Sequence, residues 1–93
     1  MSEKELIELA KLAVRTWGYE AQNNMMIEEC AEVIQVLAKR KRNINSRNLY
    51  DMISEFVDLE IMLTQMRVIY PSPFWLEIRL QKMDRLKKLL YGE

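Results

Sequence analysis

The chain contains no histidine, and this absence removes several kinds of chemistry at once. Without an imidazole, neither a Ser-His-Asp triad nor a Cys-His pair can form. The common zinc sites and the Glu-x-x-His pattern of di-iron helical bundles also depend on histidine. Any reaction must therefore use carboxylates, amines, guanidinium groups, hydroxyl groups or a bound metal.

Cysteine, glycine and proline are also scarce. The one cysteine, Cys30, excludes an intrachain disulfide and fits a reducing compartment. Two glycines and two prolines in 93 residues favour long, uninterrupted helices. No apolar run is long enough to cross a bilayer, and the acidic N-terminal segment has no secretory signal pattern. These absences predict a cytoplasmic protein with no membrane partner.

An excess of charge of either sign is missing as well. Lysine and arginine together number 14, as do aspartate and glutamate, so the formal net charge is zero. Because nucleic-acid binders usually carry a clear basic excess, we expect no nucleic-acid partner. One basic run, Lys39 to Arg42, keeps open the alternative of a helical nucleic-acid-binding protein, which the neutral charge disfavours.

What is present points to one helical domain. Hydrophobic residues make up 49% of the chain and charged residues 30%, which is typical of a globular protein, and 93 residues suffice for a single domain over residues 1–93. Apolar residues recur at helical spacing, and no segment alternates as a strand would. Ser2 begins the first helix and Gly18 ends it, while Ser72 and Pro73 begin the last. We predict four helices, over residues 2–16, 20–42, 48–69 and 72–91.

The two middle helices should form an antiparallel pair, because only a short polar turn at residues 43–47 joins them. The main apolar stripe of the first of them is expected in the core; it consists of Met26, Cys30, Val33, Ile34 and Leu37. The second is apolar almost all round, and so short a chain cannot easily cover such a helix alone. We therefore expect a homodimer or a homotetramer.

Two pairs of acidic residues interrupt these apolar helices. Glu29 and Glu32 lie in one column between Met25 and Val36, since steps of three and four residues keep to one side of a helix. Glu28 falls on the polar side instead. The column thus places two carboxylates between apolar neighbours.

The second pair, Glu55 and Asp58, lies three residues apart on the following helix. Antiparallel packing can bring the two pairs opposite each other, where four carboxylates in a partly dry space would repel unless a divalent cation were bound. Ligands that are all oxygen favour Mg²⁺, or Mn²⁺ as a substitute, over zinc. Acids at this spacing also commonly decorate a solvated helix face, so both interpretations stay open at this point.

The two acidic segments resemble the paired motifs of a known family. Glu28-Glu29-Cys30-Ala31-Glu32 and Glu55-Phe56-Val57-Asp58 resemble the EExxE and ExxD motifs of the MazG-like, all-α nucleoside triphosphate pyrophosphohydrolases. Residues 17–22 and 58–63 resemble the flanking segments, so the likeness covers about residues 17–66. It implies a four-helix, MazG-like bundle completed by oligomerisation. It also implies Mg²⁺-dependent hydrolysis of a nucleoside or deoxynucleoside triphosphate between the α and β phosphates, giving monophosphate and pyrophosphate.

By the same likeness, Glu29, Glu32, Glu55 and Asp58 are the magnesium ligands and belong to the catalytic set. Glu28 is the fifth catalytic candidate, which would orient water or a second metal, although its periodicity places it outward. The resemblance does not tell how many metal ions are bound.

Candidates for substrate contact lie at both ends of the predicted helix over residues 20–42. Lys39 and Arg42 would bind the β and γ phosphates, Trp17 would stack on the base, and Gln22 would read a base edge. Each has a structural alternative. Basic residues suit the negative end of a helix dipole, aromatic residues near a helix end often pack in a core or an interface, and polar residues are common at helix starts.

Two other functions remain open beside the nucleotide hydrolase. One is phosphoribosyl-ATP pyrophosphohydrolase activity, which shares the fold class and the chemistry. The other is a non-enzymatic helical interaction module, in which the carboxylates are structural. That alternative predicts no metal dependence and tolerance of Glu29→Gln or Asp58→Asn.

Overall fold

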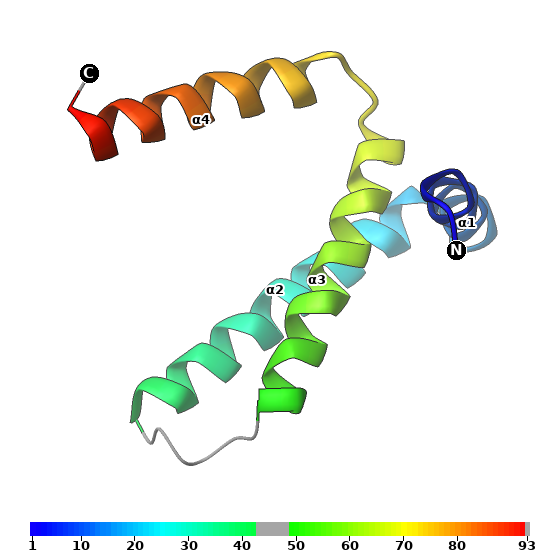
Figure 1. Ribbon diagram of the computed structural model, residues 1–93. Helices are drawn as coiled ribbons and strands as arrows, with labels where there is room; N and C mark the ends of the chain where they lie inside the picture. Colours follow the sequence, from blue (N-terminus) through cyan, green and yellow to red (C-terminus); the bar gives the residue numbers. More distant parts are fainter. Residues whose placement is uncertain (43–48, 93) are drawn as a thin grey trace.

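The computed structural model describes residues 1–42 and 49–92, without the side chain of Arg42. These ranges contain four helices and no strand: α1 (Glu3–Trp17), α2 (Tyr19–Arg42), α3 (Leu49–Ile69) and α4 (Phe74–Tyr91) (Figure 1). The all-helical prediction is confirmed, and every described helix end lies within two residues of its expected place. The predicted turn at residues 43–47 lies outside the described ranges. None of the helices seen here has the length and apolar character that a membrane span requires.

Local sequence explains both ends of α1. The Ser2 Oγ accepts a hydrogen bond from the Glu5 N–H at 3.1 Å, and the Glu5 carboxylate accepts one from the Ser2 N–H. This reciprocal pair satisfies donors that the first turn of a helix leaves open. Gly18 ends the helix with φ +88°, a conformation that a side chain disfavours, and its N–H donates to the Val14 carbonyl at 2.8 Å.

The start of α4 is nearly as predicted. The Ser72 Oγ accepts a hydrogen bond from the Phe74 N–H at 3.1 Å, and Pro73 has helical dihedral angles of φ −65° and ψ −13°. Regular helix begins at Phe74, one residue later than expected, which is within the ordinary latitude of a helix end. The N-cap is thus Pro73, which makes no side-chain cap, rather than the expected Ser72, whose hydroxyl group nevertheless accepts the first N–H of the helix.

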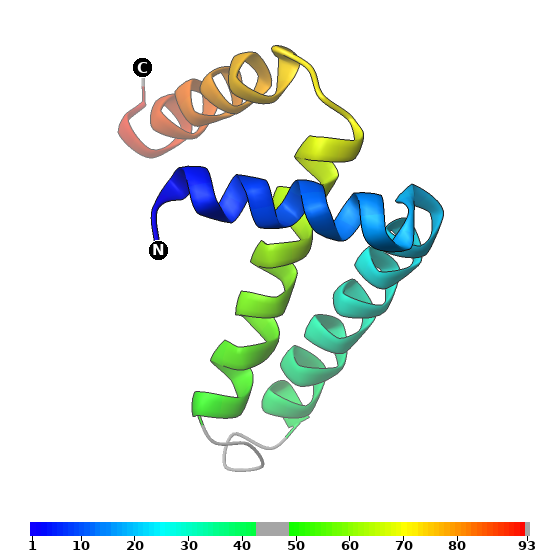
Figure 2. The ribbon, with the colours of Figure 1, turned by 90° about the vertical axis from the view of Figure 1, so that its right-hand side faces the viewer.

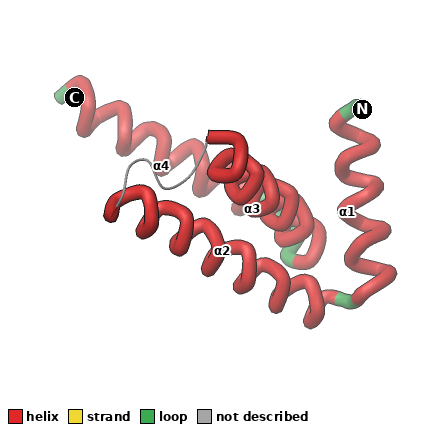
Figure 3. Tube along the Cα trace, turned by 90° about the horizontal axis from the view of Figure 1, so that it is seen from below, coloured by secondary structure: helices red, strands yellow, loops and turns green. Residues whose placement is uncertain are grey.

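The helices α2 and α3 form an antiparallel hairpin, called here the α2–α3 hairpin (Figure 1). Figure 2 shows α1 crossing the end of this hairpin at which α2 begins and α3 ends, and Figure 3 shows α2 and α3 side by side. The predicted antiparallel pairing is confirmed. Among the residues that the structure describes, the buried apolar core is small and consists of Ala10, Val36, Met52, Met62 and Met66.

Helix α4 extends away from the α2–α3 hairpin, and none of its residues is buried (Figure 1). Its first turn is attached to the end of α3. The Trp75 indole N–H donates to the Tyr70 carbonyl at 2.8 Å, and the Arg67 guanidinium lies 5.2 Å from the centroid of the Trp75 ring. Three helices of the chain thus pack together, and α4 of the same chain does not complete a four-helix bundle.

One packing prediction is wrong. Two members of the stripe expected in the core are exposed, Ile34 by 67% and Leu37 by 49%. The side of α2 toward α3 instead carries Gln22 and Val36, which are only 4% and 3% exposed. Residues seven apart lie on nearly one face of a helix, so Glu29, midway between them, shares this side. Helix α2 therefore turns a mixed polar face toward α3, while its aliphatic stripe is half-buried at Met26, Cys30 and Val33 and exposed at Ile34 and Leu37.

Candidate metal centre

A pair of buried amides links the two helices of the hairpin. The Gln22 Nε2 donates to the Gln65 Oε1 at 2.5 Å, and both side chains are buried. The sequence-based predictions did not include Gln65. The only feature that could have indicated its role is that a polar amide lies near Met62 and Met66 on a mostly apolar helix. This hydrogen bond fixes which residues of α2 lie opposite which residues of α3, because an unpaired buried amide would be costly.

The register set by the amide pair brings the two acidic pairs together. In a pair of antiparallel helices, a residue a given number of positions further along one helix faces the residue the same number of positions earlier in the other. Seven residues from the amide pair, Glu29 comes opposite Asp58, and three residues further, Glu32 comes opposite Glu55. Glu29, Glu32 and Glu55 each place a carboxylate oxygen within 4.8 Å of the other two. We call these three residues the acidic cluster.

Glu29 is the most constrained member of the acidic cluster. Its Oε2 is buried and accepts no hydrogen bond from the part of the chain that the structure describes. Burial raises the pKa of the Glu29 carboxyl above its ordinary value, and the negative charges of Asp58, Glu55 and Glu28 raise it further. A cation at this point would compensate the negative charge that gathers around Glu29.

The dimensions of the acidic cluster suit a small divalent ion. Oxygens that bind one Mg²⁺ lie about 2.1 Å from it, so two ligands on opposite sides are about 4.2 Å apart. Three oxygens within 4.8 Å of one another need only small side-chain movements to reach that geometry. Glu29 is half-buried whereas Glu32 is exposed, so the cluster opens to solvent on the Glu32 side.

The other two predicted catalytic acids lie at the border of the cluster. Asp58 is half-buried and does not belong to the group within 4.8 Å, but its charge acts on Glu29. Glu28 is exposed, as its periodicity predicted, and its charge reaches Glu29 too. Three of the four predicted ligands thus converge, with the fourth beside them.

Two open depressions adjoin these acids. One, of about 260 Å³, is lined by Asp58 together with Tyr50, Ile53, Ser54 and Val57 of α3. The other, of about 550 Å³, lies at the start of α2, and its lining residues are Trp17, Ala21, Gln22, Asn24, Met25 and Glu28. A ligand in the second depression would lie next to the acidic cluster, since Glu28 precedes Glu29.

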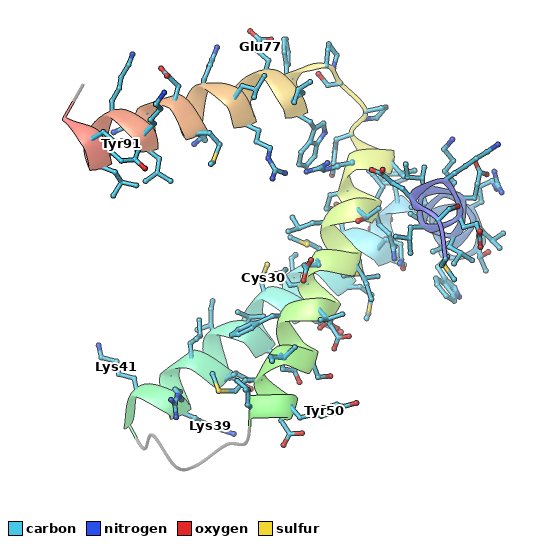
Figure 4. All side chains as sticks on the ribbon, in the orientation of Figure 1. Cys30, Lys39, Lys41, Tyr50, Glu77 and Tyr91 are labelled. Atoms are coloured by element: carbon cyan, nitrogen blue, oxygen red, sulfur yellow. The ribbon has the colours of Figure 1, made fainter. Side chains whose placement is uncertain are left out.

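The predicted substrate contacts divide between the two ends of α2. Trp17 and Gln22 line the same depression, and Trp17 is exposed. The Gln22 amide nitrogen already donates to Gln65, so the structure gives this residue a packing role that the sequence did not suggest. Lys39 is exposed near the other end of α2, about 10 Å along the axis beyond Glu32 (Figure 4). The side chain of Arg42 lies outside the described residues.

Comparison with known proteins adds no assignment to this geometry. No family model matches the chain, and neither a curated protein nor a solved structure matches it. A function must therefore be argued from the side chains of the protein itself.

Proposed function

We propose that the chain is a Mg²⁺-dependent nucleoside triphosphate pyrophosphohydrolase of the MazG-like kind. It would hydrolyse a nucleoside or deoxynucleoside triphosphate between the α and β phosphates. Mn²⁺ would substitute for Mg²⁺ because it accepts the same oxygen ligands. The motif resemblance over Glu28–Glu32 and Glu55–Asp58 suggests the reaction, and the acidic cluster supplies a place for it.

The observation that carries the proposal is the convergence of Glu29, Glu32 and Glu55. Burying carboxylates beside one another is unfavourable, and a protein gains nothing from it unless something compensates the charge. The buried Glu29 Oε2, which has no hydrogen-bond donor among the described residues, is the strongest single support for a bound cation. A purely structural role for these acids leaves this oxygen unexplained.

In this proposal each acid has a defined task. Bound Mg²⁺ would neutralise the charge of the triphosphate, which the carboxylates alone would repel. Glu29, Glu32 and Glu55 hold the ion, and Asp58 stands beside them as the fourth ligand. The exposed Glu28 would accept a proton from the attacking water. Trp17 offers an exposed ring on which a base can stack.

We further propose that the working form is a homodimer or a homotetramer in the cytoplasm. A non-enzymatic interaction module is the second candidate, because many large apolar side chains are exposed on the single chain. The two candidates differ in their response to Mg²⁺. The interaction module requires no metal and tolerates amide substitutions in the acidic cluster.

The decisive experiment measures pyrophosphate release from a panel of nucleoside triphosphates, with Mg²⁺ and with a chelator. Glu32→Gln should lower kcat/KM by about 100-fold or more, since it removes a charged ligand while keeping the shape of the side chain. Phosphoribosyl-ATP belongs in the same panel, because it separates the histidine-synthesis activity from cleavage of ordinary triphosphates.

The matched control is Glu77→Gln, the same chemical change on α4, where Glu77 points away from the rest of the molecule (Figure 4). This variant should keep the activity of the wild type. The proposal fails if no triphosphate is cleaved and Mg²⁺ leaves the melting temperature unchanged. The interaction module would then take its place.

A further inference from the structure

Two apolar surfaces of the chain are left open to solvent. The first, the α4 stripe, consists of the exposed residues Leu76, Leu80, Met83 and Leu90, which recur at helical spacing. The second, the outer face of α2, consists of the exposed residues Ile27, Ile34 and Leu37 with the half-buried Cys30 among them. In Figure 4 Cys30 lies on the side of α2 toward α4, while Glu77 lies on the far side of α4.

The dimensions of the chain show that it is less compact than a folded monomer of this length and exposes more surface. Its radius of gyration is 16.3 Å, whereas a compact domain of this length has about 12 Å. Its accessible surface is 7787 Å², whereas a folded monomer of 11.2 kDa exposes about 5,700 Å². The excess of about 2,100 Å² per chain is the area that one partner buries in a large, obligate homodimer.

Helix α4 is held in its extended position at its first turn. The Trp75 indole bonds the Tyr70 carbonyl and packs under Arg67, which directs the helix away from its own α2–α3 hairpin. Most of the stability of a helix in a protein comes from packing of its apolar face. An 18-residue helix with no buried residue therefore needs a partner from outside its own chain.

Helix α4 and the α2–α3 hairpin as a whole carry opposite net charges. Helix α4 carries five basic and two acidic residues, whereas α2 and α3 together carry eight acidic and five basic residues, of which α2 contributes four of each sign. A basic helix with an apolar stripe is thus matched to an acidic hairpin with an apolar face. Opposite potentials of this kind favour association and set its direction.

We propose that the α4 stripe of one copy packs on the outer face of α2 of a second copy. The exchange is reciprocal, so the two copies form a closed two-fold dimer. This inference rests on the self-association proposed above, but it does not depend on the hydrolase activity. Helix α1 also exposes leucines, at Leu6, Leu9 and Leu12, yet it already packs against α3, whereas α4 has no buried residue.

The first test measures the mass of the full chain by light scattering over a range of micromolar concentrations. Leu80→Glu, in the centre of the α4 stripe, should raise the dissociation constant of the dimer by roughly 100-fold, about tenfold for each of the two α4 helices. The control is the neighbouring Gln81→Glu, which adds the same charge on the polar side of α4. It should leave the dimer intact.

The second test locates the contact with the native thiol. Leu80→Cys should form, under mild oxidation, a disulfide-linked species of two chains on a non-reducing gel. The link should disappear when Cys30→Ser is added, and Gln81→Cys should not form it. A linked species that needs both thiols places α4 of one copy against α2 of another.

Other outcomes overturn the inference in distinguishable ways. A monomer at every concentration rejects both the self-association and the exchange of α4. A dimer that is insensitive to Leu80→Glu and forms no link rejects the exchange alone. A link within one chain shows that α4 folds onto its own hairpin. A monomer that binds vesicles of anionic lipid assigns α4 to a membrane surface. None of these results bears on pyrophosphate release, which is measured separately.

Discussion

The two faces of α2 reverse the usual arrangement of a globular protein. The face toward α3 contains the buried Gln22 and Val36 with the half-buried Glu29 between them, so an amide and a carboxylate accompany one aliphatic residue there. The opposite face contains Ile34 and Leu37, which are exposed. Ordinary packing would bury the aliphatic face and hydrate the acids.

Both faces are unfavourable in the isolated chain, for different physical reasons. Carboxylates in the interior lose hydration and repel one another. Exposed aliphatic side chains keep water against apolar surface and invite association. Each face is thus the basis of one proposal, a bound cation on the inside and a second copy on the outside. The contrast shows that an unfavourable surface is informative when its chemistry indicates the kind of partner that would stabilise it.

The largest expected effect is a difference in the free energy of unfolding between two alanine substitutions, one on the inner face of α3 and one on its outer face. Met62 is buried, so Met62→Ala should lower the free energy of unfolding by about 2–4 kcal/mol through lost burial and a cavity. The adjacent Ile61 is exposed, and Ile61→Ala should cost less than about 0.5 kcal/mol. Urea unfolding of dilute protein checks both values. Equal losses at the two positions would mean that the inner and outer faces of α3 are wrongly assigned.

A smaller effect is expected at the buried amide pair. Gln65→Leu leaves the Gln22 amide buried without its acceptor, which should cost about 1–3 kcal/mol in the free energy of unfolding. Replacing both amides by leucine should recover most of that loss, because no unpaired polar group remains. The measurement is a double-mutant cycle in urea. Simple addition of the two single losses would show that the amides act independently.

The smallest expected effect is a gain in the free energy of unfolding when Glu29 is replaced by glutamine in the absence of metal. Because folding raises the pKa of Glu29, the folded state holds the proton more tightly than the unfolded state does. The free energy of unfolding therefore falls as the pH rises from the unfolded value near 4.5 through the raised folded pKa, and it stays lower above that.

Glu29→Gln removes this loss, so at pH 7 without metal it should raise the melting temperature by about 2–4 °C. That corresponds to about 0.5 kcal/mol, the size of one like-charge repulsion on a helix. Saturating Mg²⁺ should stabilise the wild type and stabilise the variant less, since the variant lacks one ligand. Calorimetry at pH 4 and pH 7, with and without Mg²⁺, provides the check. A variant less stable than the wild type at pH 7 without metal would contradict the crowding of charge at Glu29.

Much of the local structure was predictable from particular residues. Ser2 with Glu5 and the lone Gly18 define α1, because capping and positive φ act within a few residues of chain. Ser72 and Pro73 mark the start of α4 for the same reason. The spacing of Glu29 and Glu32, and of Glu55 and Asp58, placed each pair on one side of a helix. A short connection then required the two helices to be antiparallel.

The sequence alone thus determined four helices, their ends and two acidic pairs, since these depend on contacts between neighbours in the chain. Only the tertiary structure decided which face of α2 turns inward, because α2 has apolar residues on both sides and periodicity cannot rank them. It also decided the register, through the hydrogen bond between Gln22 and Gln65, and so brought Glu55 to Glu29 and Glu32. The direction of α4 followed from the contact of Trp75 with Tyr70 and Arg67, which joins residues of α4 to the end of α3 and has no periodic signature.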